Sequence, residues 1–323
     1  MKDSDYAYAV ARIRANERYL LSKSDVERLV TAKTLFEAES VLKERGWNFD
    51  GEKTEIENAL EHEQKKLWAL LCESVGDRKQ LDVLCVQNDF FNLKAALKCM
   101  ITGKDANNFF AFPTSLDLET LVSAFKTHDF ELLSPEMKDT AKEAYETACR
   151  TENGQSADII IDKAALKLLL SLSKKSDCNL LFEIAEYICA CTDIKIAYRS
   201  AKAKKSLAFI ENALSGVSAL DKALLAKAAA KGTGELLEYL EKTPFAKEGE
   251  LISKSLAAFE KGTDDTVTEM TKKAKYVFFG FEPIAAYYYA KEAELKTVRV
   301  ILFAKQSGID EDTIRERVRE LYV

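Results

Sequence analysis

Apolar residues recur at helical spacing along most of the chain, and polar capping signals precede several of these stretches. Ser24 is followed three positions later by Glu27, and Thr34 by Glu37, and both patterns precede helically spaced apolar residues. These are capping-box patterns, in which the two side chains satisfy main-chain N–H groups at a helix start. We therefore predict two helices that begin here, the second of which ends at Gly46.

Further helix boundaries follow from the few prolines and glycines. A helix is expected from Thr54 to Gly76, and the Ser-Pro pair that ends at Pro135 is typical of a helix start. The Glu-Pro pair that ends at Pro283 predicts another start, for an apolar-rich helix that closes at Gly308. A last helix should follow and reach the end of the chain.

Strand signals are almost missing from the sequence. The nearest candidate is residues 158–161, Asp-Ile-Ile-Ile, which we interpret as a buried helix start. Only 12 Gly and 4 Pro occur in 323 residues, so long helices with short connections are favoured. The sequence therefore predicts an all-α fold.

A short motif recurs three times at equal spacing. Its copies begin at Asn92, Asp193 and Glu294, so both intervals are 101 positions. Each copy has an acceptor side chain, then Leu or Ile, then Lys, and a second basic residue three or four positions further on. Equal spacing of this kind indicates internal repeats of ordinary domain size. We predict three similar helical domains with the bounds 1–107, 108–208 and 209–323.

The motif lysines allow two interpretations. Lys94, Lys195 and Lys296 could position one helix against another within each repeat, or they could contact a partner protein. Only Lys296 has an acid four residues earlier, Glu292, so simple pairing along one helix does not explain all three. A structural role is favoured.

Composition narrows the class of protein. The formal net charge is −6, and no basic run extends beyond Lys202, Lys204 and Lys205, which argues against nucleic-acid binding. Seven cysteines without a CxxC motif indicate a reducing compartment. The polar opening does not resemble a signal peptide, and no stretch of about 20 apolar residues predicts a membrane span.

Catalytic and ligand-binding motifs are not found in the sequence. His62 and His128 lie outside any HExxH motif, and we expect both on exposed or partly buried helix positions. Cys189 and Cys191 have no second pair at metal-ligand spacing. We therefore identify no catalytic, cofactor-binding or metal-binding residue. An enzyme whose site is assembled from distant acids stays an alternative.

Two further features have both a structural and a functional interpretation. Asp264 and Asp265 are interpreted as a capping region before a helix rather than as a metal-binding pair. The tyrosines at 287–289 could pack in the core or contact a protein, and on one helix at least one of them should face outward. Aromatic residues nearby, Phe278, Phe279 and Phe281, fit the core interpretation.

Several stretches in a fixed order resemble one family. They are Tyr6 to Ala15 with Leu20 and Leu21, Asp89 to Lys94, Glu282-Pro283, Lys291 to Arg299, and the ending Tyr322-Val323. Together they resemble the C subunit of prokaryotic V-type and A-type ATPases, whose eukaryotic relative is the d subunit. The middle repeat departs from the pattern, because Asp193 stands where Asn would fit better.

The resemblance implies a fold and a role. The fold would be three helical domains around a pseudo-threefold axis, forming a funnel. The role would be that of a non-catalytic central-stalk socket, on the cytoplasmic face of the membrane, between the shaft subunits of D and F type and the membrane rotor ring. No nucleotide, cofactor, metal or nucleic acid would be bound. ATP-linked transport of protons or sodium ions is implied, with the ion and direction left open.

Partner-binding residues cannot be assigned from the sequence. Aromatic and arginine side chains that line the funnel are expected to serve as anchors, as at other interfaces. A helical scaffold in an unrelated assembly is the alternative function.

Overall fold

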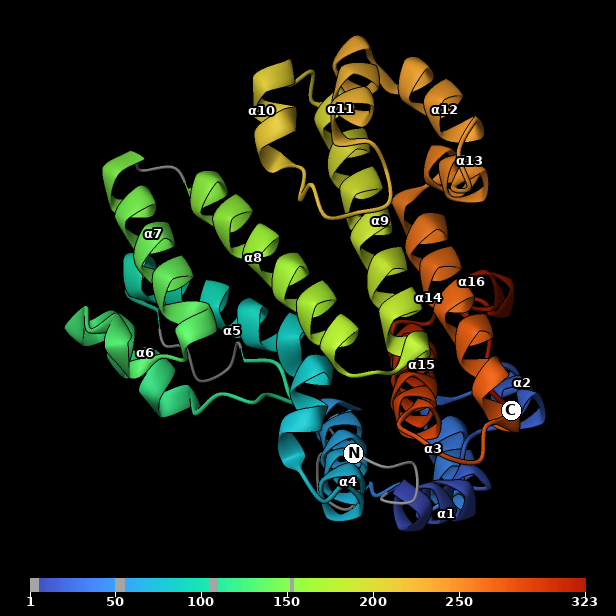
Figure 1. Cartoon of the computed structure of the whole chain (residues 1–323). Helices are drawn as coiled ribbons and strands as arrows, with labels where there is room; N and C mark the ends of the chain where they lie inside the picture. Colours follow the sequence, from blue (N-terminus) through green and yellow to red (C-terminus); the bar gives the residue numbers. More distant parts are fainter. Residues whose placement is uncertain (1–5, 50–55, 105–109, 152–153) are drawn as a thin grey trace. The chain divides into compact units, whose positions relative to one another are not determined.

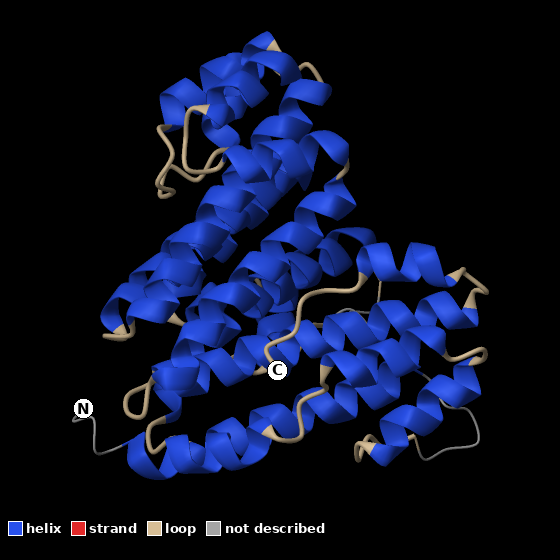
Figure 2. Cartoon of the chain, turned by 90° about the vertical axis from the view of Figure 1, so that its right-hand side faces the viewer, coloured by secondary structure: helices blue, strands red, loops and turns tan. Residues whose placement is uncertain are grey.

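The computed structural model describes residues 6–49, 56–104, 110–151 and 154–323, and these ranges are predominantly helical. Sixteen α-helices and three short 3-10 helices occur in them, without any strand (Figure 2). The all-α prediction is therefore confirmed. The arrangement of three domains as a funnel stays a prediction.

The chain forms two compact units. Unit 1 contains Met1–Arg78, Cys178–Ile184 and Ala246–Val323, and unit 2 contains Lys79–Asp177 and Ala185–Phe245. Each unit is thus built from segments that are distant in the sequence. The three domain bounds inferred from the repeat stay a prediction.

Unit 1 is organised around its longest helix, α15, which packs against α1, α3, α4 and α14. A core of buried aliphatic side chains joins α15 to α2, α3 and α4. The helices of unit 1 are α1 (Ala7–Glu17), α2 (Lys23–Thr31), α3 (Leu35–Glu44), α4 (Ile56–Ser74), α13 (Ala246–Lys254), α14 (Leu256–Lys272), η4 (Lys273–Tyr276), α15 (Glu282–Gln306) and α16 (Glu311–Arg317).

Unit 2 contains the antiparallel pair α7 and α8, and α8 also packs against α5 (Figure 1). Its helices are α5 (Asp82–Thr102), α6 (Leu118–Thr127), η3 (Phe130–Leu132), α7 (Pro135–Thr151), α8 (Gly154–Lys175), most of α9 (Asn179–Lys202), α10 (Leu207–Ala213), α11 (Lys222–Lys231) and α12 (Thr233–Glu241). The 3-10 helix η2 (Arg78–Leu81) lies at the junction of the two units in sequence. Residues 158–161 belong to α8, so the helical interpretation of that apolar run is confirmed.

The predicted helix starts are partly correct. Thr34 caps α3, and its hydroxyl accepts the N–H of Glu37 at 3.2 Å. Ser24 was expected to cap the preceding helix, but this prediction is wrong. The capping box is made instead by Ser22, whose N–H is 2.9 Å from the carboxylate of Asp25. Ser22 has an extended backbone, as a helix cap requires, whereas Ser24 already lies in the first turn.

Among the other predicted helix boundaries, some are also correct and some are displaced. Helix α7 begins at Pro135 as predicted, whereas α15 begins one residue earlier than expected, with Phe281 as its N-cap. The predicted start at Thr54 lies outside the described residues. Gly308 follows α15 with a φ of 68°, in the left-handed region that favours glycine.

Asp264 and Asp265 lie inside α14, so their interpretation as a capping region is wrong. Asp264 is 2.6 Å from the amine of Lys296 on α15 and 3.1 Å from the guanidinium of Arg319. Asp265 accepts the N–H of Glu320 at 2.7 Å. The bonds to Arg319 and Glu320 hold the end of the chain against α14. The last helix, α16, ends at Arg317, so the prediction that it reaches the end of the chain is wrong.

The acceptor residue of each repeat motif makes the same kind of hydrogen bond. In all three copies its side-chain oxygen accepts a main-chain N–H from a segment that precedes a short helix, α6, α11 or α2. The pairs are Asn92 with Ala111 at 2.6 Å, Asp193 with Ser215 at 2.8 Å, and Glu294 with Leu21 at 2.6 Å. The first two motifs bind the segment that follows them, and the third binds the start of the chain.

The basic residues of the motif join helices, as the structural interpretation predicts. Lys94 pairs with Asp162 on α8, and Lys296 pairs with Asp264 on α14. The second basic residue of the motif also makes an equivalent ion pair in two copies. Lys98 pairs with Asp158 at 2.9 Å, and Arg299 pairs with Glu57 at 2.9 Å. The two acids are themselves 101 positions apart, which matches the repeat spacing. For Lys195 the interpretation stays a prediction.

Candidate functional site

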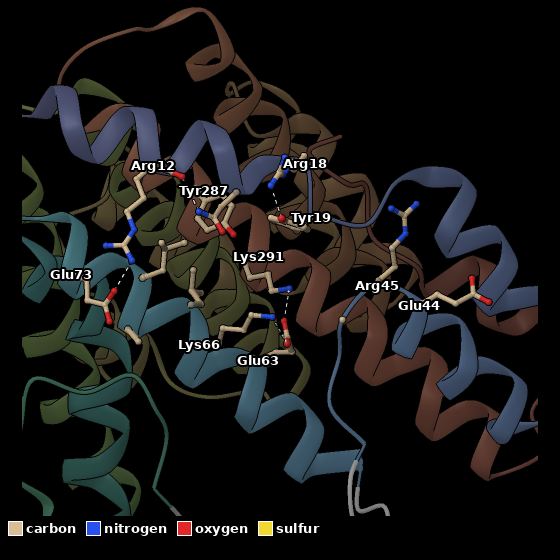
Figure 3. A pocket seen from close by; sticks show the side chains of 15 residues that line it. Arg12, Arg18, Tyr19, Glu44, Arg45, Glu63, Lys66, Glu73, Tyr287 and Lys291 are labelled. Atoms are coloured by element: carbon tan, nitrogen blue, oxygen red, sulfur yellow. Dashed lines mark hydrogen bonds and ion pairs between the residues drawn. The ribbon is translucent and has the colours of Figure 1, made fainter.

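A charged cleft of about 960 Å³ lies in unit 1 (Figure 3). Helix α1 and the turn after it, the end of α3, helix α4 and the first half of α15 contribute its lining. The lining residues are Arg12, Asn16, Arg18, Tyr19, Glu44, Arg45, Gly46, Glu63, Lys66, Leu67, Ala69, Leu70, Glu73, Tyr287 and Lys291.

A buried ion-pair cluster lies at the base of this cleft. The amine of Lys291 is 2.9 Å from Glu63 on α4 and 2.5 Å from Glu294 one turn further along α15. All three side chains are less than a tenth exposed. The ring of Trp47 lies 4.9 Å from the same amine, and Glu294 also accepts the N–H of Leu21. The cluster therefore ties α4, α15 and the turn after α1 together.

The charge state of this cluster follows from its contacts. Burial alone would lower the pKa of Lys291, but Glu294 and Glu63 raise it above its ordinary value. The lysine is thus held as a cation by two carboxylates. Burial also raises the pKa of the neighbouring Tyr287 to about 12, so its hydroxyl stays neutral.

The walls of the cleft carry arginine and tyrosine side chains. Arg12 on α1 is 2.5 Å from Glu73 on α4, which bridges the two helices. Arg18 donates a hydrogen bond of 2.6 Å to the hydroxyl of Tyr19, and its guanidinium lies 4.7 Å from the ring centroid. Arg18 has no carboxylate within ion-pair distance among the described residues. Its charge is therefore available to an anionic group that enters the cleft.

The composition of the lining indicates what the cleft can do. Five cations line it, at 12, 18, 45, 66 and 291, against three carboxylates at 44, 63 and 73. No Ser, Cys or His is among the lining residues. Two further carboxylates outside the lining, Asp25 and Glu294, pair with Arg45 and Lys291, so these charges balance and Arg18 is the cation that has no carboxylate partner among the described lining residues. A lining that contains Arg and Tyr is typical of a surface that binds a polar protein segment.

The histidines and the cysteine pair that the sequence offered as possible metal ligands lie outside the cleft. His62 is exposed on α4, and His128 ends α6, where its Nε2 lies 2.9 Å from the Tyr145 hydroxyl. Both positions agree with the expectation of exposed or partly buried helix residues. Cys189 and Cys191 are buried in α9. In the parts of the chain that the structure describes, no three His, Cys, Asp or Glu side chains are grouped as metal ligands.

The three consecutive tyrosines of α15 favour the core interpretation. Tyr287 and Tyr288 are each only 6% exposed, and Tyr289 is half-buried with its ring 5.3 Å from that of Tyr288. The expectation that one of them faces outward is therefore wrong, because α15 is surrounded by helices of unit 1 on several sides. Phe281 is buried, whereas Phe278 and Phe279 are exposed.

Sequence reasoning did not find the cleft. Its charged residues come from positions as distant as Arg12 and Lys291, and no short motif contains them. One signal was present in the sequence. The opening stretch and the stretch from Lys291 to Arg299, both singled out by the family resemblance, meet at this cleft, where Leu21 binds Glu294.

Comparison with known proteins bears on this geometry. Residues 9–317 match the model of the ATP synthase (C/AC39) subunit family, which is nearly the whole chain. The chain belongs to this family. The stretches that carried the resemblance lie within the matched residues from Ala9 to Arg299, whereas Tyr6, Tyr8 and the ending Tyr322-Val323 lie outside them.

Curated relatives agree with the family assignment. The chain is 24% identical to the C subunit of the V-type sodium ATPase of Enterococcus hirae, over 96% of this chain and 97% of that protein. It is 25% identical to the C subunit of the A-type ATP synthase of Methanocaldococcus jannaschii, over 96% of this chain and 85% of that protein. The family resemblance is therefore confirmed along almost the full length.

Across the described ranges, no helix combines the length and the apolar composition that crossing a bilayer requires.

Proposed function

We propose that this chain is a non-catalytic central-stalk subunit of a rotary V-type or A-type ATPase, and that it couples the rotor shaft to the membrane ring on the cytoplasmic face. The observation that carries the proposal is the family match over residues 9–317, together with two relatives that bear the name of the C subunit and align over 96% of this chain. The shaft subunits of D and F type and the rotor ring are its partners in this proposal.

The cleft of unit 1 is our candidate for one of the two contacts. A socket needs a concave surface that keeps its shape under load, and the buried cluster of Lys291, Glu63 and Glu294 joins the elements that form the cleft. Arginine and tyrosine are enriched among the residues that dominate binding at protein interfaces. We propose that Arg18 and Tyr19, at the wall of the cleft, contact the end of the shaft.

The first experiment is to tag the chain in its native cell, solubilise the membranes gently and identify what co-purifies. Recovery of a membrane ring with shaft and catalytic subunits, at about one copy of this chain per complex, is expected. Recovery of the chain alone, with an intact rotary ATPase that purifies without it, would refute the proposal. The alternative, a helical scaffold in an unrelated assembly, would then be favoured.

The cleft is tested separately with a charge reversal. R18E with Y19A is expected to reduce recovery of shaft subunits while leaving the melting temperature unchanged. Arg150→Glu, at an exposed position on α7 in unit 2, is the matched control. Unchanged recovery of the shaft subunits with the cleft variant would show that the contact lies elsewhere.

A further inference from the structure

The connection between α14 and α15 carries three exposed aromatic side chains. Tyr276 is 82% exposed, Phe278 is 70% exposed and Phe279 is 58% exposed. We call residues 272–279 the aromatic–basic loop, because Lys272, Lys273 and Lys275 immediately precede these aromatics. Exposed aromatic side chains that are contiguous in this way mark an interaction surface more often than single exposed apolar residues do.

The aromatic–basic loop is held firmly by the rest of unit 1. Arg14 on α1 donates hydrogen bonds to the carbonyl oxygens of Ala274 at 2.5 Å and Val277 at 2.8 Å. Phe281, just after the loop, is buried with its ring 6.0 Å from that of Tyr6. The exposure of the aromatics is therefore imposed by a braced backbone and does not result from a frayed chain end.

The charge of the loop is opposite in sign to that of the whole chain. Residues 270–281 contain three lysines and no acid, whereas the chain carries a formal net charge of −6. Lys273 pairs with Glu183 at 3.2 Å, and Lys272 pairs with Glu269 and lies 3.9 Å from Glu320, all at exposed or partly exposed positions. The amine of Lys275 lies 4.7 Å from the ring centroid of Tyr322. Exposed ion pairs of this kind contribute little and are readily exchanged, so these lysines can turn toward another anion.

We propose that the aromatic–basic loop inserts into the headgroup layer of a bilayer that contains anionic lipid. Aromatic side chains partition into the membrane interface, and nearby lysines add electrostatic attraction to anionic headgroups. Side chains that are more than half exposed project from the surface, which suits entry into a soft interface better than seating in a groove. The proposal takes the nearness of a membrane from the proposed function, but its test does not depend on that function.

The experiment uses the purified full-length chain and flotation with phosphatidylcholine vesicles, with or without phosphatidylglycerol. Binding is expected only to the anionic vesicles and should weaken as salt is raised. Y276S/F278S/F279S should reduce the partition coefficient at least tenfold. K272Q/K273Q/K275Q should reduce it by about fivefold for each lysine near the surface.

The matched control is Phe36→Ser. Phe36 on α3 is a similarly exposed aromatic at 73%, but the acids Glu37 and Glu39 follow it, and a single lysine, Lys33, precedes it nearby. Its replacement should leave vesicle binding unchanged. As a second readout, F278W should show a blue-shifted emission with anionic vesicles and quenching by brominated lipid.

Three results would overturn the lipid proposal. The first is no binding to anionic vesicles at low salt, and the second is binding that the triple serine variant leaves unaltered. The third is a pair of observations: the triple serine variant no longer co-purifies with ATPase subunits, and F278W shows no spectral shift on vesicles. Together these two observations would assign the loop to a protein partner. Co-purification of the wild-type chain tests the proposed function on its own, so the two proposals fail separately.

Discussion

The main-chain N–H of Leu21 donates a hydrogen bond of 2.6 Å to the carboxylate of Glu294, although 273 positions separate the two residues. Glu294 stands at the same place in its repeat as Asn92 and Asp193, which bind segments that come after them in the chain. The third repeat therefore uses the start of the chain where the others use their own continuation. The hydrogen bond between Leu21 and Glu294 brings the turn after α1 against α15 and so helps to form the cleft.

Loss of the buried cation beneath the cleft should be costly. In Lys291→Met, Glu63 and Glu294 would lose the buried cation that they share, and only the exposed amine of Lys66, 3.3 Å from Glu63, would remain as a counter-charge. We expect the free energy of unfolding at neutral pH to fall by about 3–5 kcal/mol, the usual cost of breaking a buried ion pair.

Urea unfolding at neutral pH measures this loss of stability. Lys65→Met is the control, because Lys65 pairs with Glu61 at an exposed position on α4, and its change should stay within about 0.5 kcal/mol. A Lys291→Met variant as stable as the wild type at neutral pH would contradict the role given to the cluster.

Replacement of Asp193 by Asn should destabilise the protein less than its replacement by Ala. Its carboxylate accepts the N–H of Ser215 and the hydroxyls of Ser215 and Ser218, each at 2.8 Å, and the side chain is 1% exposed. Asp193→Ala leaves buried donors without an acceptor and should cost about 2–4 kcal/mol. Asp193→Asn keeps one acceptor, as Asn92 does in its repeat, and should cost less than half as much. Equal losses in thermal unfolding for the two variants would refute this account.

Stability should decline at alkaline pH. Burial raises the pKa of Cys178 and of Cys189 from 9.0 to about 12. In the unfolded chain both thiols ionise near their ordinary pKa, so between pH 9 and 12 the folded state binds more protons and the free energy of unfolding falls with rising pH. The slope is at most about 1.4 kcal/mol per pH unit for each thiol.

Urea unfolding at a series of pH values checks the alkaline decline. The variant C178A/C189A should show a flatter profile between about pH 9 and 10, below the range in which tyrosines ionise. Exposed Cys149→Ala is the control and should not change the profile. A wild-type profile that stays level above pH 9 would contradict the burial of these thiols.

The C-terminal tail should contribute measurably to the stability of unit 1. Leu321 and Tyr322 are 4% and 3% exposed, and the Tyr322 hydroxyl donates a hydrogen bond of 3.1 Å to Glu17 on α1. Removal of residues 318–323 exposes the surfaces that both side chains cover and leaves Asp264 without Arg319. We expect a loss of about 3–5 kcal/mol, seen as a lower unfolding midpoint and faster proteolysis of α16. Removal of Val323 alone, which is 47% exposed, should have little effect.

Local features were predictable because their causes are local. Helical spacing of apolar residues identified the all-α fold, Thr34 and Pro135 marked helix starts, and the spacing of the motif acceptors revealed a real structural equivalence. The wrong prediction for Ser24 was also local, because Ser22, two positions earlier, forms the cap with Asp25. The wrong interpretation of Asp264 and Asp265 came from contacts that are distant in sequence. In the sequence, Asp264 and Asp265 are typical of a helix cap. In the structure, they bind Lys296 and the C-terminal tail.

The sequence by itself determined the helical class, the three copies of the motif and the family, because periodicity, capping and residue order are all properties of the chain read in one direction. Only the tertiary structure decided the cleft and the cluster at its base, since Arg12, Glu63 and Lys291 belong to different helices. It also decided that Tyr287 is buried while Phe278 is exposed. Which face of a helix is covered depends on the neighbours that pack against it, and these come from distant parts of the chain.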